Sequence, residues 1–172
     1  MYPCLFCDNH LNRSTLEAIV RPFYTDCLTV NSHASPSDVL GRILSEDFVS
    51  VGPQNKSKAV MIGQIQHFWN VIPDLKWQIE DISVDGNKVV VRSLATGSPR
   101  GDFMGVQGLD GSKSFAVCTI DIHTVVDGRV KSVYHVEDWG TALQQLKSGG
   151  AEGRPNFNVG LYQPASLSAS DR

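Results

Sequence analysis

The stretch that decides the fold is SFAVCTIDIHTVVDGRVKSVYHVEDWG, residues 114–140. Asp127-Gly128 at its centre is a two-residue hairpin signal, because both residue types tolerate the positive φ that such turns require. The segments on either side alternate apolar and polar residues, which is the pattern of half-buried antiparallel strands. The sequence therefore predicts a long hairpin with chemically distinct faces.

The facing of this hairpin depends on the length of its turn. A two-residue turn places Asp121 and His123 on the face that also carries Asp138. A three-residue turn shifts the register by one residue and moves Asp121 and His123 to the opposite face. Tyr134 stays with Asp138 in both registers, and we expect these two side chains to point into a cavity. The sequence leaves the choice of register open.

Asp138 itself supports two interpretations. In an apolar cavity, desolvation would raise the pKa of its carboxyl and make it a general base or acid near neutral pH. Alternatively, Asp138 caps the short helix expected at residues 140–147, a position that favours Asp. Alternation along the strand sends His135 and Glu137 to the other face, where His135 is a candidate for the surface or a subunit interface.

Helical patterns occupy the first part of the chain. The first begins after a candidate cap at Ser14-Thr15, and Pro22 is expected to break it. A short second helix follows Asp38. A third, with an apolar face, ends before Pro73, since the residue before proline disfavours helical geometry.

Strand patterns dominate the rest of the chain. A short strand is expected in EDFVSVGP, residues 46–53, and residues 75–98 alternate around the turn signal Asp85-Gly86. Helices first and long antiparallel strands after them predict an α+β fold. We expect a curved antiparallel sheet wrapped around the N-terminal helices, with a cone between them.

Size and composition fit one domain with tails. The chain has 172 residues, of which 41% are hydrophobic, enough to bury a sizeable core. We expect an irregular lead-in over residues 1–14, the domain over residues 15–147, and an extended tail rich in Gly, Pro and Ser over residues 148–172.

Charge and hydropathy argue against several classes of partner. The net charge of −3 is small and mixed in sign, whereas a nucleic-acid-binding protein would want a basic face. No apolar run approaches the roughly 20 residues of a membrane span. The N-terminus lacks the pattern of a cleavable signal, so a cytoplasmic protein is expected.

The cysteines do not complete a metal site. Cys4-x-x-Cys7 has the spacing of half a zinc site, with His10 nearby, but a second Cys/His pair at ligand spacing is missing. Cys27 and Cys118 stand alone in apolar surroundings, where cysteine packs as a small hydrophobe. We therefore predict no metal.

Two long segments carry a resemblance to a known family. Residues 68–105, FWNVIPDLKWQIEDISVDGNKVVVRSLATGSPRGDFMG, and residues 119–146, TIDIHTVVDGRVKSVYHVEDWGTALQQL, resemble the SnoaL-like polyketide cyclase family of the NTF2-like superfamily. The order and spacing of their elements carry the resemblance, which covers roughly residues 15–147. It implies a cone-shaped α+β barrel.

The resemblance also implies a chemistry. Family members close a ring of an ester-bearing polyketide by an intramolecular aldol reaction without a cofactor, and related proteins isomerise, dehydrate or open epoxides. The family's acid/base residue is an aspartate just before the last short helix, which corresponds to Asp138. The implied ligand is a small hydrophobic carbonyl compound, and the implied assembly is a homodimer or higher homo-oligomer.

Several further residues are candidates for the site. Asp121 and His123 could serve as acid, base or hydrogen-bond donor, and Arg92 needs a carboxylate partner if it is buried in mid-strand. An aromatic wall for the ligand is expected from Tyr24, Phe48, Trp69 and Tyr134.

Two other functions remain open. One is a binding module of the same fold that holds a small hydrophobic ligand without turnover. The other is an epoxide hydrolase in which Asp121, Arg92 and Asp138 activate a water molecule. The three functions differ in which side chains share the cavity.

Overall fold

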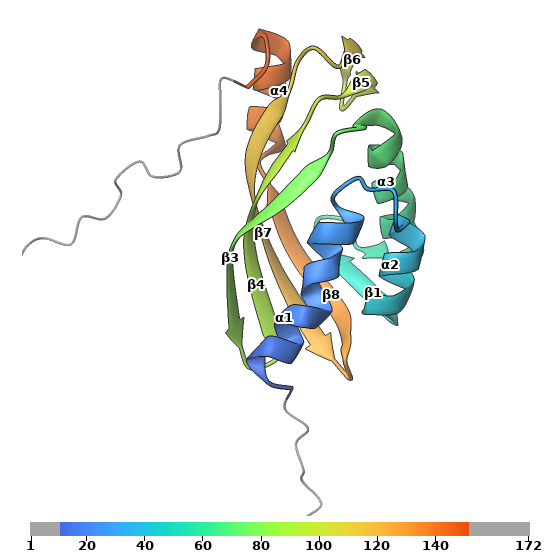
Figure 1. The fold of residues 1–172 in the computed structure, drawn as a ribbon, viewed down its shortest axis with the longest axis vertical. Helices are drawn as coiled ribbons and strands as arrows, with labels where there is room; N and C mark the ends of the chain where they lie inside the picture. Colours follow the sequence, from blue (N-terminus) through green and yellow to red (C-terminus); the bar gives the residue numbers. More distant parts are fainter. Residues whose placement is uncertain (1–10, 152–172) are drawn as a thin grey trace, which may run out of the picture.

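A computed structural model describes residues 11–151 as a curved sheet with helices packed on one face (Figure 1). The six strands are arranged in the order β2-β1-β8-β7-β4-β3. Their bounds are β1 Leu44–Val51, β2 Lys56–Ser57, β3 Lys76–Asp85, β4 Lys88–Gly97, β7 Phe115–Val126 and β8 Arg129–Glu137. The predicted α+β class is confirmed, but the sheet is open and does not close into a barrel.

Three helices lie against one face of the sheet, and a fourth packs at one end (Figure 1). They are α1 Arg13–Pro22, α2 Pro36–Ile43, α3 Lys58–Val71 and α4 Trp139–Ser148. A short hairpin that the sequence analysis did not predict, β5 Arg100–Phe103 and β6 Val106–Asp110, forms a separate two-stranded sheet near α4.

Both predicted hairpins are present, and one pairing in the sheet is parallel. β3 and β4 pair around Gly86, and β7 and β8 pair around Gly128, all antiparallel. β1 instead runs parallel to β8, with Ser50 beside Val133. The antiparallel arrangement that we expected is therefore wrong for this pair. The chain leaves α2 at the end of the sheet where β8 also begins, so β1 and β8 run in the same direction.

The first helix positions a residue of the site. Asn12 caps it by accepting a hydrogen bond from the Thr15 N–H, so the predicted cap at Ser14-Thr15 is wrong. The regular helix ends at Pro22 as predicted, and one π-helical turn, Phe23–Cys27, continues it. This wider turn directs Tyr24 into the core, where it is fully buried.

The core lies between the inner sheet face and the helices, and aromatic rings close one end of it. Trp139 packs edge-to-face against Phe68, Phe103 and Phe115, with ring centroids 5.7 to 5.9 Å apart. Aromatic pairs at this separation contribute beyond the area they bury. The cluster therefore joins α3, the β5–β6 hairpin and α4 to the sheet.

The outer face of β7 and β8 is apolar and exposed. Ile120 and Ile122 pair with Val136 and Tyr134, and the four side chains keep between 36% and 72% of their surface open. This patch needs an explanation, because contiguous exposed apolar surface often marks a binding face.

Within residues 11–151, no helix is long and apolar enough to cross a membrane.

Among the described glycines, Gly97 has the closest neighbours, which gives a first prediction. A Cβ at this position would lie 2.4 Å from Ile72 Cγ2 and 3.3 Å from Phe115 Cζ. We expect Gly97→Ala to lower the free energy of unfolding by about 1–3 kcal/mol, the usual cost of overpacking. Urea denaturation followed by circular dichroism measures the change.

Gly63→Ala in α3 is the matched control for this prediction. A Cβ at Gly63 meets nothing within 4 Å, and alanine is the better helix former by up to ~1 kcal/mol. We therefore expect this variant to be as stable as the parent or more so. Equal stability of the two variants would contradict the packing assigned to Gly97.

Candidate functional site

The geometry of the site follows from one irregularity in the β7–β8 hairpin. The turn has two residues, with positive φ at both Asp127 and Gly128, as a type I′ turn requires. Two pairs beyond the turn, the register shifts: Thr124 pairs with Ser132, and Lys131 has no partner opposite it. This bulge exchanges the two faces of β8 for the rest of its length.

The bulge turns His135 and Glu137 inward and Tyr134 outward. Asp121 pairs with His135, and Thr119 pairs with Glu137, all on the face toward the helices. Tyr134 is 54% exposed on the opposite face. The prediction that Tyr134 lines the cavity is therefore wrong, and so is the outward placement of His135 and Glu137.

Asp138 caps α4 and does not enter the cavity. It is exposed, and its Oδ1 accepts a hydrogen bond from the Thr141 N–H at 3.0 Å. The inward placement of Asp138 is wrong, because β8 ends at Glu137 and its outward alternation carries Asp138 away from the core. Of the two interpretations of this residue, the cap is the one that the structure contains.

Arg92 also lies on the outer face. Arg92 on β4 pairs with Ile120 on β7, the residue before Asp121. Because side chains alternate along a strand and Asp121 points inward, Ile120 and Arg92 point outward. The set Asp121, Arg92 and Asp138 that an epoxide hydrolase was expected to use is therefore not assembled.

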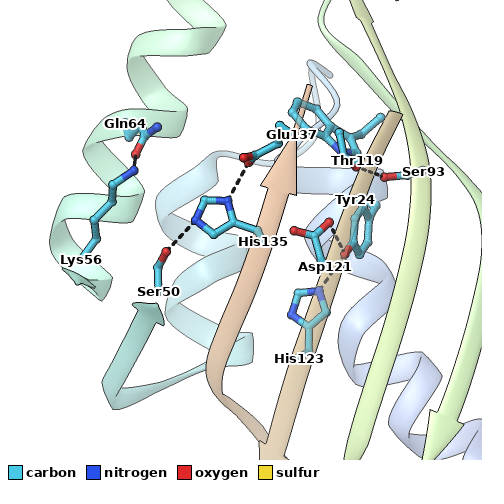
Figure 2. A network of polar contacts seen from close by, with 11 residues as sticks. Tyr24, Ser50, Lys56, Gln64, Ser93, Thr119, Asp121, His123, His135 and Glu137 are labelled. Atoms are coloured by element: carbon cyan, nitrogen blue, oxygen red, sulfur yellow. Dashed lines mark hydrogen bonds and ion pairs between the residues drawn. The ribbon is translucent and has the colours of Figure 1, made fainter. Parts of the chain in front are cut away.

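A buried polar triad forms the centre of the site. The Tyr24 hydroxyl lies 2.9 Å from Asp121 Oδ2 and 2.7 Å from His123 Nε2 (Figure 2). Asp121 keeps 5% of its surface exposed, and His123 and Tyr24 keep none. The inward position of Asp121 and His123, on the same face two residues apart, is the arrangement that strand alternation allows.

The single hydroxyl proton of Tyr24 fixes the direction of these hydrogen bonds. When Asp121 is a carboxylate it can only accept, so Tyr24 donates to it and His123 donates its Nε2–H to the Tyr24 oxygen. His123 Nδ1 then carries a lone pair, and it is buried without a partner among the described residues. Burial also lowers the pKa of His123 to about 3, so this imidazole is neutral.

Asp121 titrates near neutral pH. Burial raises the pKa of its carboxyl from 3.8 to about 7, against the lowering effect of the hydrogen bond from Tyr24. The charges of Glu137 and His135 act in opposite directions on it, Glu137 raising the pKa and His135 lowering it. A carboxyl with this pKa can both take and return a proton at physiological pH.

A second polar group lies beside the triad. His135 Nδ1 is 2.7 Å from Glu137 Oε1, and its Nε2 is 3.0 Å from the hydroxyl of Ser50 (Figure 2). The hydrogen bond with Glu137 raises the pKa of His135, which favours the imidazolium form. The site thus combines a carboxyl that is easily protonated with an imidazole that is readily charged.

Asp121, His135 and Glu137 line a small cavity of about 30 Å3. That is room for one or two water molecules. Its lining is mostly apolar and comes from α3, the π-helical turn, β3, β7 and β8: Phe23, Leu28, Met61, Gln64, Ile65, Phe68, Trp77, Asp121, Val133, His135 and Glu137. A larger hollow of about 470 Å3 lies at the hairpin turns, but it opens to solvent, and among the described residues Asp127 is the only ionisable one that lines it. The smaller cavity, whose lining includes Asp121, His135 and Glu137, is therefore the better candidate for a catalytic site.

None of the four side chains expected to form the aromatic wall is among those that line the cavity. Tyr24 enters the triad, whereas Phe48 is buried in the core and does not line the cavity. Trp69 donates its indole N–H to the Cys27 carbonyl instead. Trp77, which the sequence analysis did not single out, lines the cavity and bonds Thr119 Oγ1. Its alternation in the β3 pattern was the signal that could have found it.

No metal-binding cluster occurs in the part of the chain that the structure describes. Residues 11–151 contain no group of three His, Cys, Asp or Glu side chains placed to hold an ion. The half-site at Cys4 and Cys7 lies outside the described residues.

The chain matches a known protein family. A model of the SnoaL-like polyketide cyclase family matches residues 18–146, most of the chain. The chain belongs to the SnoaL-like polyketide cyclase family. The family assignment that the sequence segments suggested is thus confirmed, while no curated protein matches the chain.

Solved structures show the same SnoaL-like fold at low identity. A SnoaL-like protein from Jannaschia sp. CCS1 is 20% identical, with a TM-score of 0.69 over 78% of this chain and 93% of that one. TsrD from Streptomyces laurentii is 21% identical, with a TM-score of 0.66 over 79% and 97%. An LEH-like epoxide hydrolase from M. tuberculosis is 16% identical, with a TM-score of 0.58 over 79% and 92%.

The raised pKa of Asp121 predicts a pH-dependent stability difference. Between pH 4 and pH 7 the folded protein holds a proton on Asp121 that the unfolded chain has lost, so this residue destabilises the fold increasingly as pH rises. Asp121→Asn removes the effect. Relative to the parent, we expect its free energy of unfolding to rise by roughly 1 kcal/mol per pH unit between pH 5 and pH 7, with the slope flattening near pH 7 and the difference levelling off above it.

Urea denaturation of both proteins at pH 5, 6, 7 and 8 measures this difference. Asp138→Asn is the control, since Asp138 is exposed and lies outside the cavity. Its difference from the parent should not follow the same slope. A difference between parent and Asp121→Asn that stays constant with pH would show that the Asp121 carboxyl is not desolvated.

Proposed function

We propose that this SnoaL-like protein performs cofactor-free acid/base catalysis on a small hydrophobic carbonyl compound, with Asp121 as the acid/base. The observation that carries the proposal is a buried carboxyl with a pKa of about 7 in the wall of a mostly apolar cavity. Strongly shifted carboxyls in such cavities are typical of catalytic sites. Asp121 takes the role that the sequence analysis gave first to Asp138.

The proposed step is proton abstraction next to a carbonyl group. Asp121 as carboxylate takes the proton, and the electrons of the broken C–H bond pass to the carbonyl oxygen as an enolate. His135, whose pKa is raised by Glu137, lies in the same cavity, and its imidazolium form favours this developing negative charge. The protonated Asp121 then returns its proton to the product. Ring closure, isomerisation and dehydration can all begin from such an enolate.

Tyr24 and His123 hold the base in place in this mechanism. The hydrogen bond from Tyr24 orients Asp121 and keeps one of its two carboxyl oxygens occupied. The other oxygen, Oδ1, is therefore the atom available to the ligand. His123 is a positioning residue, because it touches Tyr24 and not the cavity.

Ligand entry must widen the cavity, and α3 is the wall that can respond. This helix contributes Met61, Gln64, Ile65 and Phe68 to the lining. Methionine is unbranched and adapts its shape readily, and Gln64 is only half-buried.

The alternative function is a module that binds a hydrophobic ligand without turnover. It is favoured by the position of Asp138, which is exposed and caps α4 instead of facing the cavity. A turnover measurement separates it from catalysis.

For assembly, we propose that the outer sheet face forms a homodimer interface. The resemblance implied a dimer, and the patch of Ile120, Ile122, Tyr134 and Val136 offers a self-complementary apolar surface. A two-fold axis through its centre would pair like surfaces, as symmetric dimers require. The patch lies on the reverse side of the strands that carry Asp121 and His135.

The acid/base proposal predicts a loss of proton exchange in one variant. In D2O the parent protein should accelerate exchange of the acidic C1 protons of 2-tetralone, a small bicyclic ketone. Asp121→Asn keeps the shape of the side chain but cannot accept a proton, so its catalysed rate should fall by about 100-fold or more. Proton NMR follows the exchange directly.

Asp138→Asn is the matched control for this exchange. Asparagine caps helices as well as aspartate does, so stability and the exchange rate should both stay near the parent values. Loss of exchange in this variant alone would restore Asp138 as the base. Chemical-shift changes on ketone binding without any exchange in the parent would favour the binding module.

The dimer proposal predicts dissociation by a single charge. Val136→Lys places an ammonium group in the centre of the proposed interface, so the dimer dissociation constant should rise by about tenfold or more. Sedimentation velocity over a concentration series measures it. Val60→Lys alters a similarly exposed valine on α3 and should leave the dimer intact; a monomeric parent protein at 100 µM, roughly 2 mg/ml, would contradict the proposal.

A further inference from the structure

Lys56 places a positive charge beside the acid/base cavity, and no carboxylate among residues 11–151 is bonded to it. Its ammonium donates to Gln64 Oε1 at 2.7 Å (Figure 2), and among the described residues this amide oxygen is its only hydrogen-bond partner. Lys58 and Lys131, by contrast, form ion pairs with Glu46 and Asp47. A half-buried ammonium without a counter-ion is costly unless another anion offsets its charge.

The sheet brings Lys56 and the site to the same end of three neighbouring strands. Lys56 on β2 pairs directly with Ser50 on β1, and the Ser50 hydroxyl bonds His135 on β8. Lys56 is near enough to His135 to oppose the rise of its pKa. Gln64, which holds the ammonium, is itself part of the cavity lining.

The charges around the cavity leave room for one negative group. Glu137 is paired with His135, so the positive charge of Lys56 is left without a carboxylate partner among the described residues. A ligand with a single anionic group would neutralise this excess. The same ligand would also compensate Lys56 for its lost hydration.

Gln64 supplies the second half of a recognition pair. Its Oε1 is occupied by Lys56, while its Nε2 has no partner among residues 11–151 and remains free to donate. An ammonium and an amide N–H side by side present two donors to the two oxygens of a carboxylate. Gln64 comes from α3, the wall that ligand entry must move.

We propose that Lys56 and Gln64 form a carboxylate-binding subsite at the edge of the cavity, so that the substrate is a carbonyl compound with a free carboxylate. The inference rests on the proposed acid/base function and narrows its substrate class to keto acids. The carboxylate lies against Lys56 and Gln64, and the hydrophobic part with its ketone extends toward Asp121.

The test compares an acid with its neutral ester. Isothermal titration calorimetry at pH 7 and 0.15 M salt measures 4-oxo-4-phenylbutanoate and its methyl ester against the full chain. The parent protein should bind the acid at least tenfold more tightly than the ester. Lys56→Met should weaken acid binding by about tenfold and abolish the preference, while Lys56→Arg should retain most of it.

Lys88→Met is the matched control, since it removes an equal charge from an exposed position on β4 outside the cavity. Its acid preference should equal that of the parent. No acid binding or no acid preference in the parent, unchanged acid binding in Lys56→Met, or an equal loss in Lys88→Met would each overturn the inference.

The proposed function is tested separately by exchange of the neutral ketone 2-tetralone in the parent protein. Exchange without any acid preference overturns the carboxylate subsite alone. Acid preference without exchange overturns the acid/base function and leaves the subsite in place.

Discussion

The unpaired residue Lys131 determines which side chains of this molecule are inside. Because strand side chains alternate, one skipped residue in β8 reverses the facing of every residue between it and the end of the strand. The bulge therefore brings His135 and Glu137 to Asp121 and leaves Val136 in solvent. The cavity, the Ser50 contact and the apolar outer face all follow from this one irregularity.

Asp121 and His123 are buried in their neutral forms, and each costs stability at pH values where the unfolded chain would ionise it. Burial raises the pKa of Asp121 and lowers that of His123, so their effects on stability have opposite slopes between pH 4 and pH 6.5. As pH rises, Asp121 makes the fold less stable while His123 makes it more stable. The two effects oppose each other, so His123 offsets part of the pH dependence that the buried Asp121 carboxyl gives the fold.

Much of the fold follows from short-range signals in the sequence, while the site depends on a long-range one. Asp127-Gly128 predicts the turn correctly, Pro22 predicts the end of the first regular helix, and the succession of helices and strands predicts the layers. The bulge at Lys131 has no such signal, because any residue can be skipped. The sequence identified Asp121 as a candidate. Because the bulge could not be foreseen, its neighbour His135 was assigned to the wrong face.

The hydrogen bond between Tyr24 and Asp121 joins positions 97 residues apart in the chain. Tyr24 follows the first helix, and Asp121 lies on β7, the last strand but one along the chain. Most of the domain lies between them in sequence and must be ordered before they meet. Loop closure over such a distance is slow and late in folding. The acid/base centre consequently cannot exist in a partly folded chain, and the appearance of its neutral-range titration would report that folding is complete.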